Sequence, residues 1–174
     1  MSSTALPYTQ SKSCSRKNFD LGPNATFDEG GVATRSQFCC VRQYNKDKLD
    51  KFRIDFFVLA DSKYYFIRHI DVYQGKNASN IDIHPQAQNL PTTMKAVVNA
   101  CYQTQMANDP NGARTLYADN RYSCPELLAI LYEEMNILGA GTCRKNRKGF
   151  PGDDSRLVIP SQSQQGTFKH LYNK

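Results

Sequence analysis

Two apolar runs in the first half of the chain predict an antiparallel hairpin. Residues 52–60 and 64–73 are both rich in aromatic and β-branched residues, and the polar segment 61–63 separates them. Runs of this length and composition are typical of strands, and such a short connection favours antiparallel pairing. We therefore expect two long neighbouring strands here.

Two further strands are predicted to carry acidic residues at their ends. Ala25-Thr26-Phe27 precedes Asp28-Glu29, and we expect Gly30-Gly31 to end this strand because glycine lets the backbone turn away. Residues 114–118 predict another strand, with Asp119 at its C-terminal end. If the two strands are neighbours, their acids lie at one edge of the sheet.

The pattern changes to a helical period in the second half of the chain. A helix over about 92–105 is predicted because apolar residues recur at helical spacing, at Met94, Val97, Val98, Cys101 and Tyr102. A second helix is predicted over 124–137, with Ser123 as its N-cap and Glu126 completing a capping box. Residues 139–143 predict one more short strand. The order β, β, β, α, β, α, β predicts an α/β fold with a mixed sheet.

Length and composition are those of one globular domain. The chain has 174 residues, of which 40% are hydrophobic and 22% charged. The longest apolar run, 56–60, is far too short to span a bilayer, and the polar first twenty residues lack a secretory signal pattern. We therefore expect a protein of the cell interior, with its six cysteines reduced.

The chain has a net charge of +6, and one short segment of it is strongly basic. Between Gly141 and Pro151 the chain carries four cations and no acid, and the segment consists of Arg144, Lys145, Asn146, Arg147 and Lys148. These side chains suit the phosphate backbone of DNA, which they would contact without reading its sequence. The alternative is a solvated surface loop, which charge runs often form.

The two strand-end acids, Asp28 and Asp119, are the candidate metal ligands. Two carboxylates at close range repel each other unless a divalent cation offsets their charge, so the pair is consistent with a Mg²⁺ site. The alternative is that both are ordinary turn or helix-flanking residues, and Glu29 either assists them or faces solvent. The chain offers no catalytic partner at a suitable spacing for His69, His84, His170, Ser36 or Ser123.

Several motifs together resemble the piggyBac family of DDE transposases. Two of them lie in the second half of the chain: Asp119-Asn120-Arg121-Tyr122-Ser123, followed by a leucine-rich helix, and Gly141-Thr142-Cys143-Arg144-Lys145-Asn146-Arg147-Lys148-Gly149-Phe150-Pro151. Upstream blocks in the same family order are Asp28-Glu29-Gly30-Gly31, Arg35-Ser36, Arg42 to Lys48, and Asp71-Val72-Tyr73 with Gly75-Lys76. The resemblance covers about residues 24–151.

The resemblance implies an RNase H-like domain in which three aspartates hold two Mg²⁺ ions. By motif position, Asp28 is the first aspartate and Asp119 the second. The third belongs to a Gly-Gly-Val-Asp-like motif on a later helix, beyond an inserted helical domain, and these 174 residues contain no such motif. Asp153 and Asp154 lack that context. The expected fold is thus an incomplete RNase H-like sheet flanked by helices, without the C-terminal catalytic helix and the insertion.

The expected organisation is a disordered lead-in over 1–22, a partial transposase domain over 23–151 and a polar tail over 152–174. The resemblance implies DNA as partner, neither a membrane nor a small-molecule substrate, and a nuclear location, or a cytoplasmic one without import. It leaves homo-oligomerisation open. We expect the chain to bind DNA without catalysing transposition alone. The alternative is a transposon-derived DNA-binding or interaction protein without catalysis.

Overall fold

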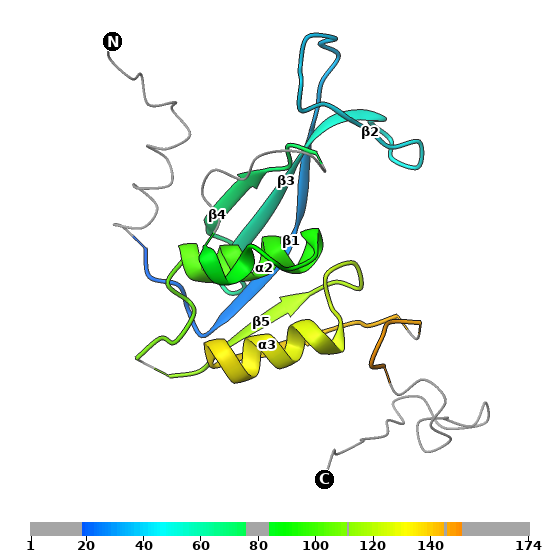
Figure 1. The fold of residues 1–174 in the computed structure, drawn as a ribbon. Coiled ribbons are helices and arrows are strands. Elements are labelled where there is room, and N and C mark those ends of the chain that lie inside the picture. Colours follow the sequence, from blue (N-terminus) through cyan, green and yellow to red (C-terminus); the bar gives the residue numbers. More distant parts are fainter. Residues whose placement is uncertain (1–18, 76–83, 111, 145, 151–174) are drawn as a thin grey trace, which may run out of the picture.

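The structure, a computed structural model, describes residues 19–75, 84–110, 112–144 and 146–150 (Figure 1). Its strands are β1 (Asn24–Ala33), β2 (Gln43–Tyr44), β3 (Phe52–Asp61), β4 (Ile67–Val72), β5 (Arg114–Ala118) and β6 (Ile137–Gly141). Its helices are the short 3-10 helix η1 (Pro85–Ala87), α2 (Thr92–Gln103) and α3 (Pro125–Met135).

All six strands form one mixed sheet, and five of them follow the order β2-β3-β1-β5-β6. The sixth strand, β4, pairs with residues 56–60 of β3, whereas β2 pairs with residues 52–53 of the same strand. Strand β1 is antiparallel to β3 and parallel to β5, and β5 is parallel to β6. The first three long strands therefore form an antiparallel unit, and β5 and β6 extend it in parallel. The predicted mixed α/β sheet and the antiparallel 52–60/64–73 pair are confirmed, with β4 shorter than expected.

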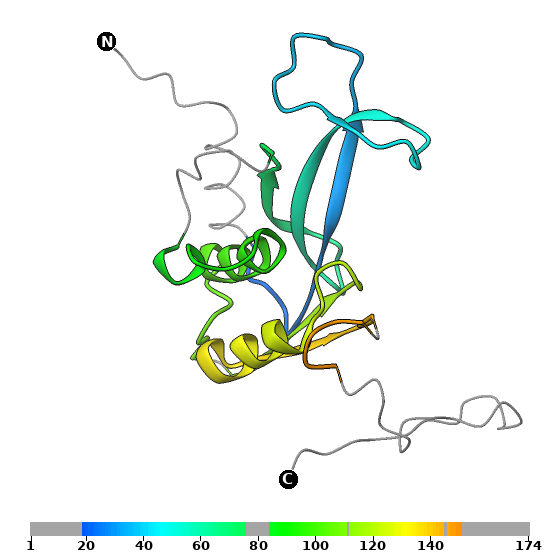
Figure 2. The same ribbon diagram turned by 45° about the vertical axis from the view of Figure 1, so that its right-hand side comes forward.

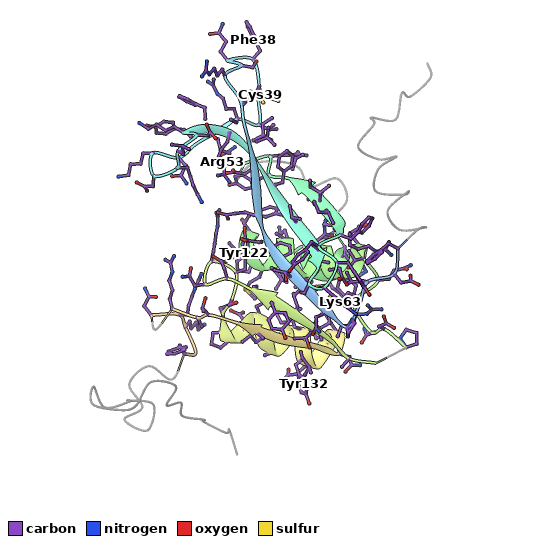
Figure 3. All side chains as sticks on the ribbon, turned by 180° about the vertical axis from the view of Figure 1, so that it is seen from behind. Phe38, Cys39, Arg53, Lys63, Tyr122 and Tyr132 are labelled. Carbon is purple, nitrogen blue, oxygen red and sulfur yellow. The ribbon has the colours of Figure 1, made fainter. Side chains whose placement is uncertain are left out.

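Both long helices lie on the same face of the sheet, since the strands stand in front of both helices when the molecule is viewed from behind (Figure 3). The core between the helices and this face includes Phe27, Leu59 and Leu116 from the strands, which are at most 1% exposed. Helix α2 contributes Met94, Val97, Val98 and Cys101, and α3 contributes Leu127, Leu131 and Met135. Burying each such side chain contributes roughly 1.5–3 kcal/mol.

The opposite face of the sheet, here called the open face, is not covered by any helix in the described ranges (Figure 3). Because side chains alternate along a strand, the neighbours of the core residues point to this face. Thr26 is exposed, and Tyr117 and Leu138 are 44% and 47% exposed. The open face is thus partly apolar.

Strand β1 is longer than its sequence predicted. Gly30 and Gly31 were expected to end it, but they continue the ladder opposite Phe56 and Asp55 of β3. A Cβ atom at Gly31 would overlap the guanidinium group of Arg53, so this glycine makes room for a neighbouring side chain. The extended pair β1–β3, with the connection 34–51, projects from the rest of the domain (Figure 2).

The predicted capping box of the second helix is wrong. The N-cap of α3 is Cys124, without a side-chain cap, and Pro125 occupies the first turn. Ser123 instead donates its hydroxyl to the carbonyl oxygen of Ala118 at 3.1 Å. The hydroxyl bonds this carbonyl because it lies between the end of β5 and the start of the helix, where Ser123 is 1% exposed and a buried hydroxyl needs a partner.

The packed domain includes residues from the end of the expected lead-in. Leu21 is 6% exposed, and its carbonyl oxygen accepts a hydrogen bond from the Arg114 guanidinium. The rest of the lead-in, residues 1–18, and the polar tail lie outside the described residues.

Asp61 anchors the N-terminal end of the domain to the β3–β4 turn. It is 1% exposed, and its carboxylate accepts backbone N–H groups from Gly22, Lys63 and Tyr64 at 2.7–2.9 Å. Burial by itself would raise the pKa of Asp61, but these three donors and the charge of Lys63 outweigh it, so the pKa lies below its ordinary value.

We predict that Asp61→Asn lowers the free energy of unfolding at neutral pH by about 1–3 kcal/mol, because one amide oxygen cannot replace two carboxylate oxygens and the new NH₂ group faces a donor. A depressed folded-state pKa stabilises the fold above the unfolded value of about 3.9, and this contribution is lost as the pH falls through the folded value. Urea unfolding across pH should therefore show a shallower acid loss in the variant. Asp50→Asn, at an exposed position, is the control, and equal pH profiles for Asp61→Asn and wild type would contradict the role of Asp61.

Candidate metal and DNA site

The parallel pairing of β1 with β5 places the two candidate acids side by side. Phe27 lies opposite Ala118 as the last pair of this ladder, so Asp28 and Asp119 occupy the next position on neighbouring strands. The sequence predicted this juxtaposition at one sheet edge. Asp28 differs from the prediction in that it lies within β1, at the point where β5 ends beside it.

Both carboxylates are exposed, and each uses one oxygen in a local hydrogen bond. Asp28 Oδ1 accepts the N–H of Glu29 at 2.7 Å, and Asp119 Oδ1 accepts the N–H of Arg121 at 2.9 Å. Asp28 and Asp119 follow Thr26 and Tyr117 by two residues, which puts them on the open-face side of the sheet. Among the described residues, the second oxygen of each carboxylate has no hydrogen-bond partner and is open to a cation.

The described part of the chain brings no group of three or more His, Cys, Asp or Glu side chains together for a metal ion. Glu29 does not join Asp28, because successive strand side chains point to opposite faces. Its carboxylate instead contacts Arg121 and Tyr122, a partner set for which we find no signal in the sequence. Two oxygen ligands suit a hard cation such as Mg²⁺ but leave most of its coordination positions to water or phosphate.

The turn that carries Asp119 is held by bonds to its own backbone and to β5. The carbonyl oxygen of Asp119 accepts the N–H groups of Tyr122 and Ser123 at 3.2 and 2.9 Å. Gly141, at the end of β6, lies so close that a Cβ atom there would overlap the Ala118 carbonyl oxygen and the Ser123 hydroxyl. The glycine of the second motif is thus explained by close packing against the turn of the first.

The basic segment reaches the same turn. Arg147 donates to the carbonyl oxygens of Asn120 and Arg121 at 3.1 and 2.8 Å, and Arg144 donates to the Asn120 side chain at 3.3 Å. Arg147 is half-buried, whereas Arg144, Asn146 and Lys148 are exposed. Lys145 lies outside the described residues. The predicted basic segment therefore lies beside Asp119, with Arg147 turned inward.

The histidines and cysteines of the described part form no catalytic pair with the acids. The ring of His84 stacks on that of Tyr102 at a centroid distance of 3.8 Å. His69, a residue of β4, is buried, with 3% of its surface exposed. Five cysteines are free thiols, as predicted: Cys39, Cys40, Cys101, Cys124 and Cys143. Burial raises the pKa of Cys101 to about 12, so this thiol is unreactive at neutral pH. His170 and Cys14 lie outside the described residues.

Without the two-residue strand β2, the strand order is β4-β3-β1-β5-β6, in which β4, β3 and β1 are antiparallel and β5 and β6 continue in parallel with β1, and this is the order of the RNase H-like fold. The model of the transposase IS4 family matches residues 8–174, and the chain belongs to this family. The cryo-EM structure of the piggyBac transposase synaptic complex with hairpin DNA has the same fold, with a TM-score of 0.67 and 21% sequence identity. That match covers 80% of this chain and 27% of the transposase. No curated protein matches the chain significantly.

The predicted transposase membership and RNase H-like fold are thereby confirmed. None of the helices in the described ranges is both long and apolar enough to cross a membrane.

We predict that Gly141→Ala destabilises the domain by about 1–3 kcal/mol, because the new methyl group overlaps a backbone carbonyl that cannot move without breaking the turn. Urea unfolding measures the loss. Gly30→Ala is the matched control, since its Cβ would meet only Val58 at an ordinary 3.4 Å. Similar stabilities of the two variants would show that Gly141 has no such constraint.

Proposed function

We propose that this chain supplies the metal- and DNA-binding part of a piggyBac-type DDE transposase, with Asp28 and Asp119 as the ligands of Mg²⁺. The observation that carries the proposal is the register of β1 and β5, which puts two exposed carboxylates at adjacent positions where β5 ends beside β1. In DNA transposition a pair of Mg²⁺ ions would activate the attacking oxygen and stabilise the leaving oxygen of a phosphodiester.

The basic segment is proposed to hold the DNA backbone next to these acids. Arg144, Lys145, Asn146 and Lys148 would contact phosphate oxygens, and Arg147 would brace the Asp119 turn from within while adding positive charge. The solved structure that shares this fold is a complex with hairpin DNA, which supports a DNA partner. A nuclear location follows from such a substrate, whereas homo-oligomerisation stays open.

We further propose that the isolated 174-residue chain binds DNA without cutting it. Two-metal phosphoryl transfer needs both ions held about 4 Å apart, and two carboxylates supply too few bridging ligands for that. A Mg²⁺ cleavage assay on duplexes with family-type ends should show no product. Cleavage that depends on Asp119 would contradict this and would direct attention to Asp153 and Asp154 as third ligands.

We predict weak binding of Mn²⁺, as a probe for Mg²⁺, that Asp28→Asn or Asp119→Asn reduces at least tenfold, since each substitution removes half of the carboxylate ligands. Electron paramagnetic resonance of free Mn²⁺ measures the affinity. Asp50→Asn is the control, because it removes the same charge from an exposed position in the connection between β2 and β3. If neither site variant changes the affinity, these residues are not the ligands.

We predict that Arg144→Ala and Lys148→Ala each lower the slope of log K against log salt by about 0.9, the value for one lost phosphate contact, without changing sequence preference. Electrophoretic shifts over a salt series measure the slope. Lys63→Ala is the control, since Lys63 is exposed at the β3–β4 turn, away from the basic segment (Figure 3). Arg147→Ala should chiefly lower stability, because it leaves two turn carbonyls without their donor. Equal slopes for the Lys63 and Lys148 variants would contradict a DNA contact by the basic segment.

A further inference from the structure

A buried phenol links β1 to the turn that carries Asp119. Tyr122 is 1% exposed, and its hydroxyl donates a hydrogen bond to Glu29 Oε2 at 3.0 Å. Its ring meets Phe27 and Phe57 edge to face, with centroid distances of 4.9 and 6.2 Å. The aromatic contacts hold the ring in place, and the hydroxyl joins residues 93 positions apart in the sequence.

The same carboxylate oxygen also binds a cation from the turn. The Arg121 guanidinium forms an ion pair with Glu29, and it lies 5.8 Å from the centre of the Tyr122 ring. The backbone N–H of Arg121 donates to Asp119 Oδ1 at 2.9 Å. Glu29 is therefore one residue from Asp28 in β1 and is connected through Arg121 to the carboxylate of Asp119.

The environment keeps this connection intact at neutral pH. The Tyr122 phenol is protonated at neutral pH, as any tyrosine is, and it therefore donates to Glu29. Glu29 is shielded, with 22% of its side chain exposed, and its bonds are charge-assisted.

We propose that Glu29 is a positioning residue, which sets the separation of Asp28 and Asp119 by holding Tyr122 and Arg121 against β1. This inference rests on the proposed metal site. The ladder between β1 and β5 ends at Phe27 and Ala118, one position before the two aspartates. Beyond that point the Glu29 contacts tie the Asp119 turn to β1 from the side of the sheet opposite the carboxylates. Outer partners of this kind typically change metal affinity 10–100-fold when removed.

The test compares Tyr122→Phe, Glu29→Ala and Glu29→Gln in the 174-residue chain. Tyr122→Phe removes one oxygen atom and keeps the ring contacts, so the core stays filled. Glu29→Gln keeps an oxygen that can accept from Tyr122 but loses the charge that binds Arg121. Ser62→Ala is the matched control, since it removes a side-chain hydrogen bond of 2.8 Å to Thr26 in β1 that does not involve the Asp119 turn.

Two quantities are measured, the Mn²⁺ affinity and the hydrogen exchange of backbone amides without metal. We expect Tyr122→Phe and Glu29→Ala to weaken Mn²⁺ binding about tenfold and to speed exchange at Tyr122 and Ser123, whose N–H groups bond to Asp119. Glu29→Gln should weaken Mn²⁺ binding and speed exchange less than Glu29→Ala does. Ser62→Ala should leave both unchanged.

Unchanged exchange in the turn overturns the proposal without reference to any metal. Faster exchange with unchanged Mn²⁺ affinity also overturns it, because Glu29 would then stabilise the turn without setting the site. If Asp28→Asn and Asp119→Asn reduce Mn²⁺ binding while the Glu29 and Tyr122 variants do not, the positioning role fails and the proposed function stands. If the aspartate variants have no effect either, the metal site itself fails and the positioning role fails with it.

Discussion

Parallel pairing between β1 and β5 is the contact on which the candidate site depends. It joins strands that are about ninety positions apart, and forming such a pair costs chain entropy that local contacts cannot offset. The offset comes from the layer below, where Phe27 and Leu116 of these strands pack with residues of both helices. Without this pairing, Asp28 would lie at the centre of an antiparallel pair with no acidic neighbour from the second half of the chain.

The turn after β5 shows how backbone hydrogen bonding shapes the site. Backbone carbonyl groups need donors, and here side chains of the turn itself and of the basic segment supply them. The Ala118 carbonyl accepts from Ser123, and those of Asn120 and Arg121 accept from Arg147. The two motifs of the second half of the chain are therefore one structural unit, in which the strand end, the turn and the basic segment hold one another.

The neighbouring acids Asp28 and Glu29 of β1 point to opposite faces of the sheet, because side chains alternate along a strand. Asp28 points to the exposed side, where the proposed cation and phosphate would approach, and Glu29 points to the side of the helices, where Tyr122 and Arg121 contact it. The exposed side continues into the partly apolar open face. A one-residue shift of β1 against β5 would exchange these roles, so the register is as important as the identity of the acids.

The sequence by itself determined the order of the longer strands and helices, though not β2 or η1, together with the antiparallel pair, the helical periodicity of α2 and the family motifs, because these are expressed in local composition and spacing. It did not reveal the extension of β1 through Gly30 and Gly31, the role of Ser123, or the inward orientation of Arg147. The extension of β1 depends on its pairing with β3, and the orientation of Arg147 depends on the Asp119 turn, both distant in sequence. The Ser123 hydroxyl bonds the nearby Ala118 carbonyl, but only the folded path of the turn brings the two together. The sequence did not reveal the contact between Glu29 and Tyr122 either, because these residues are 93 positions apart. Local pattern predicts which elements form, and only tertiary packing decides which polar groups face each other once those elements meet.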